Sequence, residues 1–138
     1  MSTSVFALHT ARYHMPFLGY LRAGLDSLRR NFSPLTHPLP DLTGYDAAII
    51  CGPIWTSYPA APLSTFFKEA ALLPPVLGLM LTHGNHSPPQ KAFEQAEREI
   101  GRSFTAKDSI SNNIENTPEA ARRIADFART VVAAAEMA

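Results

Sequence analysis

Side chains able to bind a ligand are gathered in three segments of the chain, residues 9–16, 53–62 and 82–87. The second segment holds the only tryptophan, Trp55, together with Pro53, Ile54 and Thr56. An exposed indole on a loop suits a flat aromatic ligand, because offset stacking contributes about 0.5–1.5 kcal/mol beyond the buried area. Packing of Trp55 beneath its own loop is the structural alternative. These four residues are therefore our first candidates for ligand contact.

The first segment carries groups that suit an anion and contains Thr10, Arg12, Tyr13 and His14. Arg12 offers a charge-assisted hydrogen-bonding fork, and Thr10 and Tyr13 offer hydroxyls. The start of the helix expected to follow adds backbone amides and its dipole. Together these groups predict a phosphate site. The alternative is that Arg12 is only solvated and no phosphate site exists.

The third segment begins with Thr82, His83, Gly84 and Asn85. Gly84 permits a positive φ angle and a close approach of the backbone to a ligand. His83 is a candidate substrate contact, and its alternative is an exposed loop histidine without a role. All four residues are predicted to line a binding site.

Metal binding and nucleophilic catalysis have little support in these segments. They hold His9, His14, His83 and His86, but no His-x-x-x-His pair on a helix and no nearby carboxylate accompany them. Cys51 falls at the end of an apolar run, where a thiol is usually an inert small hydrophobe. A hydrolase or transferase using His83 or His14 as a base ranks last, because the chain lacks a Gly-x-Ser-x-Gly nucleophile elbow.

Composition narrows the class of protein further. The chain has 138 residues, which suits a single domain over residues 1–138, and its 12 basic and 12 acidic residues give no net charge. That balance argues against a nucleic-acid partner. The lone cysteine suits a reducing compartment, and no apolar run is long enough for a membrane span. We therefore expect a cytoplasmic protein with no membrane partner.

Short apolar runs alternate with stretches of helical period, and this order predicts βαβ units around a parallel sheet. The Pro-rich stretch 32–40 permits only a short edge strand, and the alanine-rich tail from Ala133 is expected to fray. Gly101 marks the end of one helix, and Thr117-Pro118 marks the start of the last. The expected strands are residues 5–8, part of 32–40, 47–51, 76–81 and 103–110; the expected helices are 18–30, 59–72, 88–100 and one from 118.

Residues 41–68 carry a more specific pattern. Tyr45-Asp46 precedes the apolar run 47–51, which is followed by Gly52-Pro53, the aromatic Trp55, and a Pro-x-x-Pro sequence at residues 59–62. In this order the chain resembles the flavodoxin-like family. The resemblance implies a three-layer, doubly wound α/β fold with a five-stranded parallel sheet in the order 2-1-3-4-5. Residues 9–14 depart from the family's hydroxyl- and glycine-rich phosphate loop.

The resemblance also implies a cofactor, FMN, bound noncovalently. In that family the segment equivalent to 53–62 packs on the flavin ring, so Trp55 is expected to stack on it, and segment 82–87 is expected to line its other side. A protonated His83 would then stabilise a reduced, anionic flavin. The expected function is electron transfer or a small flavin-dependent oxidation–reduction, with a redox partner protein or a small-molecule acceptor such as a quinone. A homodimer is a further expectation. The alternative is a relative that has lost FMN and serves as a binding or interaction module.

Overall fold

The computed structural model describes residues 2–10, 16–29, 34–84 and 88–138. Within these residues the helices are α1 (Pro16–Arg29), α2 (Ala61–Glu69), α3 (Gln90–Ile100) and α4 (Pro118–Met137), with a short 3₁₀ turn at Asn112–Ile114. The strands are β1 (Ala47–Trp55), β2 (Tyr58–Pro59), β3 (Val76–His83) and β4 (Ala106–Ser111).

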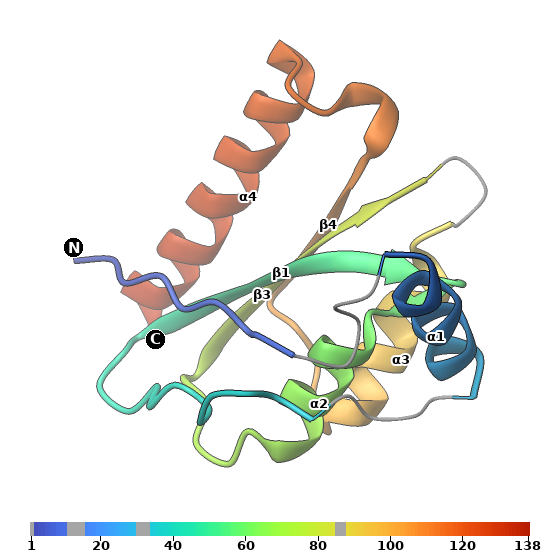
Figure 1. Ribbon diagram of the computed structural model, residues 1–138. Coiled ribbons are helices and arrows are strands. Elements are labelled where there is room, and N and C mark those ends of the chain that lie inside the picture. Colours follow the sequence, from blue (N-terminus) through green and yellow to red (C-terminus); the bar gives the residue numbers. More distant parts are fainter. Residues whose placement is uncertain (1, 11–15, 30–33, 85–87) are drawn as a thin grey trace.

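The strands form one four-stranded sheet in the order β2-β1-β3-β4. β1, β3 and β4 run parallel, whereas β2 is antiparallel to the end of β1. Helices α2 and α3 cover one face of this sheet and α4 covers the other (Figure 1). The central strand β3 is buried on both faces, as expected for a parallel strand between two helical layers.

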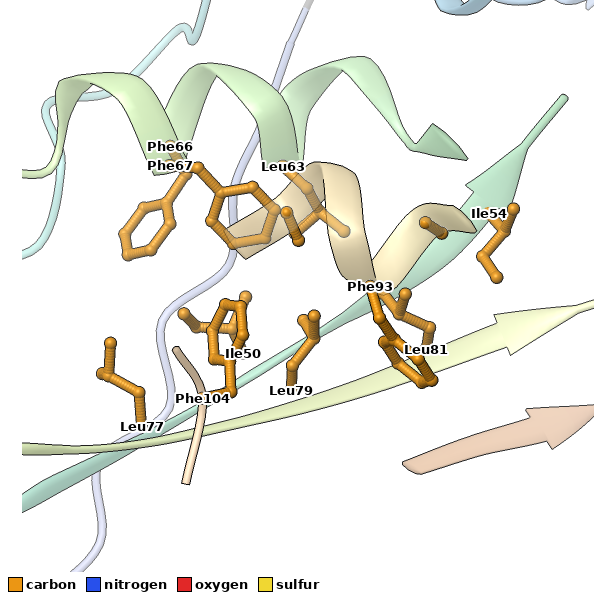
Figure 2. Close-up of a cluster of buried hydrophobic side chains, with 12 residues drawn as sticks. Ile50, Ile54, Leu63, Phe66, Phe67, Leu77, Leu79, Leu81, Phe93 and Phe104 are labelled. Carbon is orange, nitrogen blue, oxygen red and sulfur yellow. The ribbon is translucent and has the colours of Figure 1, made fainter. Parts of the chain in front are cut away.

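Two apolar clusters, one on each face, hold these layers together. The larger cluster joins alternate residues of β1 and β3 to α2 and α3, and Figure 2 shows their side chains interdigitating: Ile50, Ile54, Leu63, Phe66, Phe67, Leu77, Leu79, Leu81, Phe93 and Phe104. The smaller cluster lies under α4 and contains Val76, Met80, Ile110, Ala120, Phe127 and Val131.

Two strand glycines allow the helices to approach the sheet closely. A Cβ on Gly52 would lie 2.4 Å from Cδ1 of Leu63 in α2. On the other face, a Cβ on Gly78 would lie 2.8 Å from Phe127 and 2.8 Å from Val131, both in α4. These distances are too short for carbon–carbon contact, so both helices pack directly against strand backbone.

Several predictions from the helix-end signals are confirmed. Gly101 ends α3 in the left-handed conformation, with φ of 76°. Thr117 caps α4, because its hydroxyl accepts a hydrogen bond from the amide of Ala120. The helix predicted over residues 18–30 is α1, and the apolar runs at 47–51 and 76–81 lie within β1 and β3.

The predicted strand at residues 5–8 is wrong for this structure, and residues 34–40 contain no strand either. The sheet of the described residues therefore has four strands and does not reproduce the order 2-1-3-4-5. The amide of Thr36 donates a hydrogen bond to the carbonyl of His9, the residue after the first segment, at 2.8 Å. Pro34, Pro38 and Pro40 lack an N–H group, so the second segment has few donors for a ladder.

Three further expectations need correction. β1 does not stop at Cys51 but continues to Trp55, because it forms a hairpin with β2. The second helix is shorter than expected and spans Ala61–Glu69. The alanine-rich tail does not fray, since α4 continues to Met137. In the part of the chain that is described, we find no helix long and apolar enough to cross a membrane.

Candidate functional site

The candidate site lies at the edge of the sheet where the parallel strands β1, β3 and β4 end. Register pairing places Pro53 of β1 beside Thr82 of β3, and His83 of β3 beside Ser111 of β4. The sheet therefore brings the second and third predicted segments together. Ligands of open parallel sheets bind beyond this edge, where the loops leave the carboxyl ends of the strands.

A tight hairpin between β1 and β2 positions Trp55. Its turn consists of Thr56 and Ser57, with φ of 49° and 70°, a conformation in which asparagine and glycine are usual. Trp55 pairs directly with Tyr58 across the hairpin, so both aromatic side chains project from the same face of this ribbon. The hydrogen bond from the amide of Ala60 to the carbonyl of Pro53, at 3.0 Å, fixes the base of the hairpin.

Lys91 in the first turn of α3 is a neighbour of the hairpin that sequence reasoning missed. Its Nζ atom lies 5.1 Å from the centre of the Tyr58 ring, within the range of a cation–π contact. Lys91 is exposed, so this corner of the site carries an accessible positive charge. An aromatic residue at 58 is visible in the sequence, but nothing there indicates that a lysine 33 residues later lies over it.

The imidazole of His83 has a defined orientation. Its Nδ1 atom lies 3.0 Å from the carbonyl oxygen of Gly84. A carbonyl only accepts hydrogen bonds, so this contact requires a proton on Nδ1. In the neutral ring Nε2 is then an acceptor, and in the protonated ring it becomes a second donor. His83 is half-buried.

The predicted role of Gly84 needs a different explanation. Its φ is not in the left-handed region, so the backbone there does not require glycine. Among the described residues, a Cβ at Gly84 would meet nothing within 4 Å. Room beside this position, rather than an unusual turn, is therefore what would let a ligand approach the backbone.

The remaining site predictions divide into four groups. The side chain of Ile54 is buried in the core between β1 and α2, so a contact with a ligand would have to be made by its backbone. Pro53 and Thr56 are exposed, Trp55 and Thr82 are half-buried, and all four lie at the site. Thr10 is half-buried in the N-terminal segment, and its placement at the site is not established. The predictions for Arg12, Tyr13, His14 and Asn85 lie outside the described residues.

Cys51 differs from its predicted buried state. Its neighbour Gly52 faces α2, so Cys51 points to the opposite face of the sheet, and the residue is exposed. Partial desolvation of the sulfur nevertheless raises the pKa of the thiol. The sequence argument failed because it assumed that helices cover both faces of β1, and α4 leaves part of one face uncovered.

Two surface depressions of the described residues lie away from this edge. A shallow depression of about 480 Å³ is lined by Glu94, Glu97, Arg98, Arg102 and Ser103, near the end of α3. A second, of about 370 Å³, lies between β4 and α4. Neither depression is lined by a predicted site residue. An ion pair between Glu97 and Lys107, next to the first depression, connects α3 to β4. Among the described residues no group of three or more histidine, cysteine or acidic side chains is placed to hold a metal ion.

The described residues form an α/β fold with a mostly parallel four-stranded sheet flanked by helices. Among solved structures, the chain is similar to a flavoprotein from Lactobacillus acidophilus NCFM whose crystal structure contains FMN, with a TM-score of 0.61 and 16% sequence identity. The similarity covers 74% of this chain and 71% of that protein. At this level of identity it shows a shared fold. No protein family model matches the chain, and no curated protein matches its sequence.

Proposed function

We propose that this protein binds FMN noncovalently and acts in electron transfer or as a small flavin-dependent oxidoreductase. The observation that carries the proposal is the position of Trp55, held on a hairpin at the end of β1, two residues beyond the Pro53–Thr82 pair. The similar fold of a flavoprotein in complex with FMN gives independent support. When bound, FMN supplies the oxidation–reduction chemistry, and the protein binds and orients it.

The residues at the site suit a flat heterocycle with polar edges. The indole of Trp55 offers an aromatic face for stacking. Among the described residues nothing fills the space at Gly84, which leaves room there for the edge of a flat ring. The Nε2 atom of His83 would accept or donate one hydrogen bond, depending on the protonation of the ring. Lys91 adds a positive charge that would favour a reduced, anionic flavin.

The electron acceptor in this proposal is either a partner protein or a small molecule. The neutral overall charge gives no long-range attraction to a charged partner protein. A small acceptor, such as a quinone or a nicotinamide-linked compound, is therefore as consistent with the chain as a carrier role.

The test is a titration of flavin-free protein with FMN, followed by quenching of flavin fluorescence. We expect micromolar or tighter binding, which Trp55→Ala weakens by about 2- to 13-fold if the ring loses 0.5–1.5 kcal/mol of stacking. The matched control is Tyr45→Ala, which removes an aromatic side chain just before the opposite end of β1 and should leave the affinity unchanged. Absence of binding by the wild type would overturn the proposal and leave the binding or interaction module as the better interpretation.

A further inference from the structure

Two histidines that the proposed function does not use lie next to each other where the N-terminal segment meets residues 34–40. The ring centres of His9 and His37 are 5.3 Å apart, and the ring planes meet at 62°. Both residues are exposed, so the pair is accessible to dissolved ions. The sequence did not indicate this pair, because His37 falls outside the three segments from which ligand-binding residues were predicted.

Thr36 holds the two segments together at this point. Its amide donates a hydrogen bond to the carbonyl oxygen of His9 at 2.8 Å, and its hydroxyl donates a second one to the same oxygen at 3.2 Å. A carbonyl oxygen has two lone pairs, so it accepts both hydrogen bonds. This double contact joins residues 9 and 36 and thereby places the next residue, His37, beside His9.

The same hydroxyl determines the tautomer of His37. The Oγ1 atom of Thr36 lies 3.0 Å from Nδ1 of His37. A hydroxyl has one hydrogen, which the carbonyl of His9 accepts, so Nδ1 of His37 is the donor in this contact. In the neutral ring Nε2 then carries a lone pair. Metal-binding histidines usually have this arrangement, in which the second ring nitrogen donates to a protein or water oxygen and thereby orients the ring.

The spacing of the rings matches two imidazoles bound to one metal ion. At metal–nitrogen distances of about 2.1 Å and a tetrahedral angle, two bound rings have their centres about 5 Å apart. The observed separation of 5.3 Å is close to this value, and rotation of the exposed His9 side chain completes the approach.

We propose that His9 and His37 form a binding site for a divalent first-row transition ion such as Zn²⁺, which imidazole nitrogen suits. Two protein ligands leave coordination positions for water, so the ion binds reversibly and links the N-terminal segment to residues 34–40. This site is independent of the proposed FMN site.

Isothermal titration calorimetry of the wild-type protein with zinc chloride measures the site, and we expect one ion per chain. The second imidazole binds as an intramolecular ligand, so His9→Ala and His37→Ala should each weaken binding by about tenfold or more. His83→Ala is the matched control and should leave the affinity unchanged, because no described group of three or more possible ligands joins His83 to this pair. Absence of binding by the wild type would overturn the inference. So would two independent ions, one lost in each variant while the other keeps its affinity.

Thr36 is a positioning residue in this site, and two variants test that role. Thr36→Val removes the hydroxyl that orients His37, and loss of such a partner weakens metal binding by about 10- to 100-fold. Thr36→Ser keeps a hydroxyl and should retain the affinity of the wild type. Equal Zn²⁺ affinities of these two variants would overturn the inference.

Amide hydrogen exchange at Thr36 tests the link between the two segments. Opening of this junction breaks the hydrogen bond to His9 and requires release of the ion. Zn²⁺ at about 100 times its dissociation constant should therefore slow the exchange by about hundredfold. An exchange rate that bound Zn²⁺ leaves unchanged would overturn the inference.

Discussion

Replacement of Gly52 by alanine tests how closely α2 packs against the strand that leads into the site. The new methyl group would lie 2.4, 3.0 and 3.2 Å from Cδ1, Cγ and Cδ2 of Leu63. Carbon atoms in contact are about 3.5–4.0 Å apart, so the leucine would have to move by about 1 Å. Leu63 is 4% exposed and packed within the larger cluster, so it has no free space to enter. We expect Gly52→Ala to lower the free energy of unfolding by about 1–3 kcal/mol.

The same geometry predicts that a second substitution compensates for the first. Leu63→Ala alone should cost about 2–5 kcal/mol, because it leaves a cavity. In the double variant the alanine methyl group at position 52 enters that cavity, so the two costs should not add. We expect a favourable coupling of about 0.5–3 kcal/mol. Urea unfolding, followed by the fluorescence of Trp55 and by circular dichroism, measures all four proteins.

The matched control uses Gly78, whose added methyl group would meet Phe127 and Val131 on the opposite face of the sheet. Gly78→Ala should therefore be destabilising in its own right, yet additive with Leu63→Ala. Costs of Gly52→Ala and Leu63→Ala that add to within about 0.5 kcal/mol would refute the packing argument.

Two further predictions concern the second half of the chain. Thr117→Ala removes the hydroxyl that accepts from the amide of Ala120, and should lower the free energy of unfolding by about 0.5–2 kcal/mol, whereas Thr117→Ser should preserve most of it in thermal melts. Desolvation opposes ionisation of Glu97, but hydrogen bonds from Lys107 and the amide of Phe104 prevail and lower the pKa of its carboxyl group. A lowered pKa in the folded state stabilises the protein above the ordinary glutamate pKa of about 4.3, and this stabilisation is lost as the pH falls below it. Glu97→Gln should flatten the pH dependence of unfolding between about pH 5 and 3; an unchanged slope would contradict this account.

Local chemistry made the helix ends and the buried strands predictable. Thr117 and Gly101 act through hydrogen bonds and backbone angles within a few residues, so their effect needs no tertiary information. The continuous apolar run of β3 reflects burial on both faces, which the structure confirms. The predictions of these elements were correct because a single local physical cause determines each element.

The predictions were wrong where contacts between distant parts of the chain determine the local structure. Residues 5–8 have the composition of a strand, but their neighbour at 34–40 lacks donors at its prolines. Cys51 was assigned to the core because its run has no alternation, although one face of β1 is partly uncovered. Thr56-Ser57 does not carry the Asn-Gly signal of a two-residue hairpin, so the sequence of this segment indicates a loop rather than a hairpin.

The candidate site was predictable in position but not in detail. Parallel strands place their carboxyl ends at one edge, and this alone brings Pro53 next to Thr82. The contact of Lys91 with Tyr58 joins two elements through a side chain, and no sequence spacing encodes it. The burial of Ile54 could not be predicted either, because it depends on the extension of β1 by the hairpin, which turns the side chain toward α2.

The central claim is that FMN binds at the carboxyl edge of β1 and β3. It is tested most directly by ¹H–¹⁵N correlation spectra of labelled protein recorded during a titration with FMN. We predict that the largest shift changes occur at the indole N–H of Trp55 and the amides of Thr82, His83 and Gly84. The amides of residues 94–103, beside the larger surface depression, should remain unchanged. Shift changes concentrated at residues 94–103, or none at saturating FMN, would contradict the account.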